Sequence, residues 1–172
     1  AGLASKDFNT LLNDGYAAYK KGDYLTAVPT LEQAVKVNPR DVRARRYLAY
    51  AYKAADQIGE AASQFDTLYP LGALGSQDTS IYIDMLLGSG QHEKASRVLE
   101  EAIAKSPGTQ ELYLQLANAQ AAQNEIPKAI QTCNRGIAIN PRSVVGQQLI
   151  ELRKNLMTTA KPDSAPVEEP GA

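Results

Sequence analysis

Tryptophan is absent from the 172-residue chain, and histidine and cysteine occur once each, as His92 and Cys133. A single cysteine excludes an internal disulfide, and one cysteine with one histidine is too few for the usual zinc site. The segment Gly88-Ser89-Gly90 has Glu93 where a phosphate-binding loop needs its third glycine, and no nucleophile–base pair is visible. We therefore expect no catalytic residue, no metal and no cofactor, and we predict that the protein is not an enzyme.

Long hydrophobic runs and an excess of one charge are also missing. No apolar run approaches the roughly 18 residues that a membrane-spanning helix needs. The net charge of −1 gives no reason to expect nucleic acid or an anionic membrane as the main partner. One basic cluster stands out, made of Arg40, Arg43, Arg45 and Arg46. With nearby tyrosines it would suit a nucleic-acid platform. Asp41 and the neutral balance instead favour a solvated face or a contact with an acidic peptide.

What the chain does contain is a period of 34 residues. Alanine recurs four times at this spacing, at Ala27, Ala61, Ala95 and Ala129. A second column holds residues that tolerate positive φ and end helices, namely Gly22, Asp56, Gly90 and Asn124. A third column holds the helix-stopping prolines Pro39, Pro107 and Pro141, with Ala73 as its one exception. A fixed period of this length indicates stacked helical hairpins, in which small residues let two helices approach closely.

These columns resemble the tetratricopeptide repeat (TPR) family. The resemblance is carried by Gly22-Asp23-Tyr24 through Ala27 to Pro39, by Gly90 through Ala95 to Pro107, and by Leu116-Ala117 with Ala129 and Pro141. It covers about residues 5–141, although no copy has the early tryptophan of the family. It implies an all-α fold, a right-handed α-solenoid of four TPR hairpins followed by a C-terminal capping helix. Because packing residues define this family, the resemblance specifies the fold far better than the function.

The period also divides the chain. We expect one TPR domain over residues 1–157, with repeats at about 8–41, 42–75, 76–109 and 110–143. The second repeat ends early, at Tyr69 to Gly72, and a longer loop is expected from Ala73 to Asp78. Ser143 is expected to cap a helix over 143–157 that covers the last hairpin. The remaining segment, 158–172, is rich in proline and acid and is expected to be disordered.

The concave face of such a solenoid is lined by the first helix of each hairpin. The helical angle of about 100° per residue places one stripe of each first helix on that face. The expected peptide-binding groove consists of Asn13, Tyr16, Tyr19, Arg43, Arg46, Tyr47, Tyr50, Lys53, Asp84, Gln115 and Asn118. The same stripe includes Leu12, whereas Tyr52 is expected to pack inside. Tyrosine and arginine are common at binding hot spots, but they would also occur on an ordinary solvated face.

The leading functional hypothesis is a non-enzymatic protein–protein interaction module, a scaffold that binds a peptide or partner segment in this groove. One alternative is a structural TPR protein that self-assembles, with Leu149, Leu152 and Leu156 of the C-terminal helix as a seam that would make a homo-oligomer. Another is a cell-envelope or secretion assembly factor. The compartment stays open between the cytoplasm and, if Ala1 is a processed start, export to the periplasm.

Overall fold

The computed structural model describes residues 6–159, and within this range the elements are nine α-helices and one short 3-10 helix. The α-helices are α1 (Phe8–Lys20), α2 (Tyr24–Val37), α3 (Val42–Ala54), α4 (Ile58–Leu68), α5 (Ser76–Gly88), α6 (His92–Lys105), α7 (Gln110–Ala122), α8 (Ile126–Ile139) and α9 (Val144–Thr159). The 3-10 helix η1 (Tyr69–Leu71) follows α4 directly. The all-α prediction is thus confirmed for the described range, whereas the expectation of disorder concerns a segment that lies almost entirely outside it.

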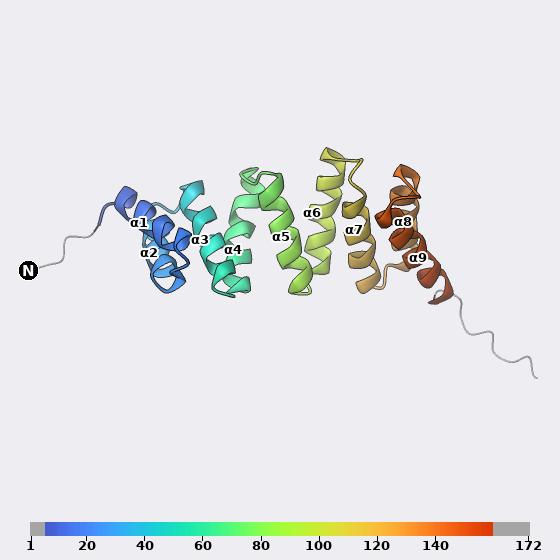
Figure 1. The fold of residues 1–172 in the computed structure, drawn as a ribbon, viewed down its shortest axis with the longest axis horizontal. Helices are drawn as coiled ribbons and strands as arrows, with labels where there is room; N and C mark the ends of the chain where they lie inside the picture. The colour runs from blue at the N-terminus through green and yellow to red at the C-terminus, as the bar shows by residue number, and fades with distance from the viewer. Residues whose placement is uncertain (1–5, 160–172) are drawn as a thin grey trace, which may run out of the picture. The chain divides into compact units, whose positions relative to one another are not determined.

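Contacts divide the chain after Ser89 into two compact units. Unit 1 contains α1 to α5 and unit 2 contains α6 to α9 (Figure 1). In unit 1 each helix packs on its neighbour in sequence, and in unit 2 α9 packs on both α8 and α7. The boundary falls inside the third expected repeat, at 76–109, and the division into four repeats stays a prediction.

The hairpin turns have the backbone that the 34-residue period predicts. Gly22 and Gly90 have φ of 77° and 73°, and the non-glycine residues Asp56 and Asn124 both have φ of 60°. A left-handed residue lets the chain reverse directly after a helix, and glycine, aspartate and asparagine adopt it at the lowest cost. The period therefore predicted these turns correctly.

The alanine column belongs to the core. Ala27, Ala61, Ala95 and Ala129 are all fully buried. The column of large apolar residues four positions further on is buried too, since Leu31, Phe65 and Leu99 are fully buried. Small and large residues therefore interdigitate in each unit, as dense packing requires.

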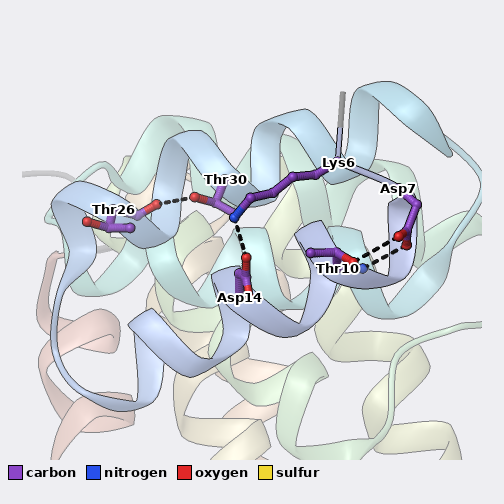
Figure 2. A network of polar contacts seen from close by, with 6 residues as sticks. All are labelled: Lys6, Asp7, Thr10, Asp14, Thr26 and Thr30. Carbon is purple, nitrogen blue, oxygen red and sulfur yellow. Dashed lines mark hydrogen bonds and ion pairs between the residues drawn. The ribbon is translucent and has the colours of Figure 1, made fainter. Parts of the chain in front are cut away.

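The first helix is fixed by polar contacts at its beginning (Figure 2). Asp7 accepts hydrogen bonds from the backbone N–H of Thr10 at 3.0 Å and from its hydroxyl at 2.9 Å. The bond from the backbone N–H, with that from the hydroxyl, lowers the pKa of the Asp7 carboxyl. Lys6, which precedes α1, forms an ion pair with Asp14 within α1, with 2.5 Å between Nζ and Oδ2. The cap at Asp7 defines where α1 starts.

The link between α4 and α5 differs from the expectation. The loop expected from Ala73 to Asp78 is shorter, because α5 already begins at Ser76 and includes Asp78. The early end of α4 at Leu68 agrees with the sequence, and Gly72 closes η1 with φ of 64°. Asp78 is 6% exposed, so this acidic residue is buried rather than part of a surface loop.

The C-terminal helix covers the end of unit 2. Ser143 caps it, since its hydroxyl oxygen accepts a hydrogen bond from the backbone N–H of Gly146 at 2.8 Å. Leu149 and Leu156 are buried in one apolar cluster with Cys133, and Leu152 packs against this cluster. Leu149 and Leu156 are thus used within unit 2 and do not offer an exposed seam, whereas a homo-oligomer through this helix stays a prediction.

Candidate functional site: a ladder of stacked tyrosines

Four tyrosines from two helices stack on unit 1. We call Tyr16, Tyr19, Tyr47 and Tyr50 the tyrosine ladder. The rings of Tyr16 on α1 and Tyr47 on α3 lie 4.3 Å apart between centroids with planes 23° apart, and those of Tyr19 and Tyr50 lie 6.3 Å and 27° apart. All four side chains are half-buried. Their rings are therefore held in place by each other, while part of each surface still faces solvent.

The ladder continues into the core of unit 1. The ring of Tyr50 meets that of Phe65 edge-on at 6.3 Å, and Phe65 lies 5.8 Å from the ring of Tyr82. Within the ladder, the ring of Tyr19 also contacts that of Tyr24 on α2, at 6.2 Å between centroids. The half-buried rings therefore rest on a rigid aromatic support, which lowers the entropy that a bound partner would cost.

A buried polar cluster anchors one end of the ladder. Arg46 pairs with Asp78 at 2.8 Å between Nε and Oδ2, and it donates a hydrogen bond to the carbonyl of Ala73 at 2.7 Å. The Tyr50 hydroxyl donates a hydrogen bond to the same carboxylate of Asp78. Burial, then this hydrogen bond, raises the pKa of the Tyr50 phenol. The cluster joins α3 to α5, so Arg46 and Tyr50 serve the fold as well as any ligand.

Most arginines of the basic cluster form ion pairs or hydrogen bonds within unit 1. Arg43 pairs with Asp41 at 3.0 Å. Arg45 donates hydrogen bonds to the carbonyl of Pro39 at 2.7 Å and to the side chain of Gln64 at 3.0 Å. Together with Arg46, three of the four clustered arginines thus have partners inside unit 1, which weakens the hypothesis of a nucleic-acid platform.

The other expected groove residues fall into two groups. Asn13 and Lys53 are exposed on α1 and α3, and Asp84 is exposed on α5, all in unit 1. Gln115 is half-buried and Asn118 exposed on α7, in unit 2. Unit 1 alone thus carries nine of the eleven expected residues, and their role in binding stays a prediction.

Two details of the sequence interpretation need correction or support. Leu12 was expected on the exposed stripe but is 5% exposed, because the stripe is narrower than the helical angle alone suggests. Tyr52 is buried as expected, and its hydroxyl donates a hydrogen bond to Glu32. Burial raises the pKa of this phenol too.

Asp78 is the residue that the sequence interpretation missed. A shift by 34 aligns it with Ala44, which is fully buried. A carboxylate in a buried column requires a cationic or hydrogen-bonding partner, so the repeat alignment contained a signal for it.

We expect Asp78→Ala to lower the free energy of unfolding by about 2 kcal/mol, because it removes the buried partner of Arg46 and Tyr50. The value is below that of a fully buried pair, since the Arg46 side chain is 29% exposed. Urea unfolding followed by circular dichroism measures it. The matched control is Gln77→Ala, the exposed neighbour on α5, which should change stability by less than about 0.5 kcal/mol. Equal losses in the two variants would contradict the assignment.

Three further observations concern metal binding, membrane crossing and the single thiol. Within residues 6–159 no three His, Cys, Asp or Glu side chains come together in a way that could hold a metal ion. None of the helices described is both long and apolar enough to cross a membrane. Cys133 is fully buried, and burial raises the pKa of its thiol to about 11, so it is a packing residue rather than a reactive thiol.

Comparison with known proteins decides the family. Residues 12–78 and residues 86–151 each match a model of the tetratricopeptide repeat. The chain belongs to the TPR family. No curated protein matches it in sequence. TPR proteins use extended concave surfaces to bind other proteins, so in general terms this chain is a protein-interaction scaffold of a family that is generally non-enzymatic.

Several solved structures share this TPR fold. A tetratricopeptide repeat protein from Parabacteroides merdae has a TM-score of 0.69 at 15% identity, over 88% of this chain. This chain spans only 60% of that protein. MamA from AMB-1 has a TM-score of 0.68 at 16% identity, covering 88% of this chain and 82% of MamA. MamA from Desulfovibrio magneticus RS-1, from residue 41 to the end, has a TM-score of 0.63 at 17% identity, covering 94% and 100%. At these identities the likeness supports the fold alone.

Proposed function

We propose that this TPR chain is a non-enzymatic scaffold that binds a peptide segment of a protein partner on the tyrosine ladder of unit 1. The observation that carries the proposal is the stack of Tyr16 on Tyr47, half-buried and fixed at 4.3 Å. Tyrosine offers a large contact area with only two rotatable side-chain bonds and a hydrogen-bonding tip. Rings that are ordered before binding lose little further entropy, and such residues make strong anchors.

The partner that suits this surface has apolar or ring-shaped side chains and carboxylates. The aromatic faces of the ladder would bind the apolar or ring-shaped side chains. The exposed Lys20 and Lys53 beside the ladder would attract the carboxylates. Arg46 is a poor candidate for the main anion contact because its guanidinium already pairs with Asp78.

The test is selection of peptides from a displayed library against the full chain, followed by binding measurements on variants. We expect Tyr47→Ala to weaken selected peptides at least about tenfold, equivalent to about 1.4 kcal/mol, while circular dichroism stays unchanged. Tyr47→Phe keeps the ring and should retain most of the affinity. The control is Leu25→Ala, a residue 93% exposed on α2, which should have no effect. Peptides that bind equally well to the Tyr47→Ala variant would move the site elsewhere.

A further inference from the structure

The lysines beside the tyrosine ladder have no acidic partner in the described part of the chain. Lys20 lies with its Nζ 6.0 Å from the centroid of the Tyr16 ring, and both Lys20 and Lys53 are exposed. Neither forms an ion pair within residues 6–159. Helix α3, which carries Lys53, contains four basic residues and no acidic one. The ladder is therefore a neutral aromatic surface with unpaired positive charge at its edge.

Residues 160–172 have the opposite character. This segment lies outside the described residues, and its sequence has three carboxylates, one lysine and three prolines. The carboxylates are Asp163, Glu168 and Glu169, and the prolines are Pro162, Pro166 and Pro170. No aromatic residue and no arginine occurs in it.

We propose that the tyrosine ladder, with Lys20 and Lys53, docks segment 160–172 of a second copy of this chain. The inference rests on the proposed peptide-binding function of the ladder and names its occupant. Proline-rich segments bind surfaces lined with aromatic rings, because the proline ring packs flat on the aromatic face and its fixed φ limits the entropy lost. The positive charges of Lys20 and Lys53 attract the carboxylates of the segment, which increases the rate at which the two surfaces associate.

The phenol of Tyr19 suits such a ligand. Burial, with the neighbouring tyrosines, raises the pKa of the Tyr19 phenol above its ordinary value. The Tyr19 hydroxyl can donate a hydrogen bond to a carbonyl or carboxylate of the docked segment. A phenolate at this place would repel the same carboxylates.

A second copy is the occupant to which we commit. The segment follows α9 of unit 2, whereas the ladder belongs to unit 1. A second molecule can bring its own segment 160–172 to the ladder, whatever the arrangement of the two units within one molecule. Because ladder and segment are different surfaces, the contact is heterologous, and it makes either a closed pair by reciprocal exchange or a growing chain of copies.

The test is sedimentation velocity of the full chain over a wide range of concentration, at low and at high salt. We expect reversible association that high salt weakens. The triple change Asp163→Lys, Glu168→Lys and Glu169→Lys should weaken it at least about tenfold. The double change Lys20→Glu and Lys53→Glu should do the same. A mixture of the two variants restores opposite charges between copies and should recover association. A strict monomer at all concentrations, or association that ignores these changes, would overturn the inference.

A peptide experiment separates this inference from the proposed function. A labelled synthetic peptide of residues 160–172 is titrated with the full chain, beside a control in which the three carboxylates are amides. Binding of the acidic peptide, weakened by Tyr47→Ala and by loss of the carboxylates, supports the inference. Should library-selected peptides depend on Tyr47 while this peptide does not bind, the inference fails and the proposed function stands. Should no peptide depend on Tyr47, both fail.

Discussion

Replacement of Phe65 by alanine is expected to lower the free energy of unfolding by about 3–5 kcal/mol, the range for deleting a buried aromatic ring. Phe65 is fully buried, and its ring lies between those of Tyr50 and Tyr82. The vacated space would leave these tyrosines without a neighbour on one side, and close-packed surroundings relax only partly. Urea unfolding followed by circular dichroism measures the loss.

The change should also reach the tyrosine ladder. Tyr50 is supported by Phe65 on one side and by Asp78 at its hydroxyl, so a cavity beneath it loosens the stack. Phe65→Leu is the matched control, because it retains much of the buried volume and should cost clearly less. If Phe65→Ala lowered the free energy of unfolding no more than Phe65→Leu, the surrounding side chains would have closed the cavity, contrary to the expectation.

Gly146→Ala is expected to destabilise unit 2 by about 3 kcal/mol, at the upper end of the usual cost of overpacking. An added Cβ would lie 2.1 Å from the carbonyl oxygen of Asn140 and 3.0 Å from the carbonyl carbon of Pro141. These are backbone atoms, so relief requires α9 to move away from the end of α8. That movement would pull Leu149 out of the apolar cluster of unit 2.

The turn before α9 has little freedom to adjust. The buried side chain of Gln110 donates hydrogen bonds to the carbonyls of Gly136 and Asn140 at 2.8 and 2.9 Å, and it accepts one from the Ser143 hydroxyl at 2.5 Å. A shift of the turn would break this buried network as well as the cap of α9.

Gly59→Ala is the control for the glycine experiment. Gly59 lies in α4, and an added Cβ there meets no atom within 4 Å. Alanine favours the helix and restricts the unfolded chain, so this change should stabilise the protein by about 0.4–1 kcal/mol. Opposite signs for the two substitutions are expected in urea unfolding. A neutral or stabilising Gly146→Ala would refute the close approach of α9 to the turn.

The sequence was sufficient for features that repeat. Positive φ at Asp56 and Asn124 follows from their alignment with Gly22 and Gly90 in a 34-residue period, and the cap at Ser143 follows from a local rule. The helix expected over 143–157 likewise agrees to within two residues with α9, which runs from Val144 to Thr159.

Features that depend on one tertiary contact were not accessible in this way. Asp78 was placed in a loop because the second repeat lacks its proline at Ala73, yet Arg46 and Tyr50 draw this carboxylate into the interior. Periodicity describes which face of a helix a residue occupies, not which partner it meets. For the same reason the ladder tyrosines were identified as a stripe, while their stacking across α1 and α3 required the structure.

The uneven distribution of aromatic rings and sulfur gives each unit its own intrinsic reporter. Eight of the nine tyrosines belong to unit 1, while the single thiol, Cys133, is buried in unit 2. Because the chain has no tryptophan, its emission comes from tyrosine and reports almost entirely on unit 1. The rate at which a thiol reagent labels Cys133 reports the opening of unit 2. Both signals can be followed in one unlabelled sample during unfolding, and their midpoints reveal whether the two halves melt together or one before the other.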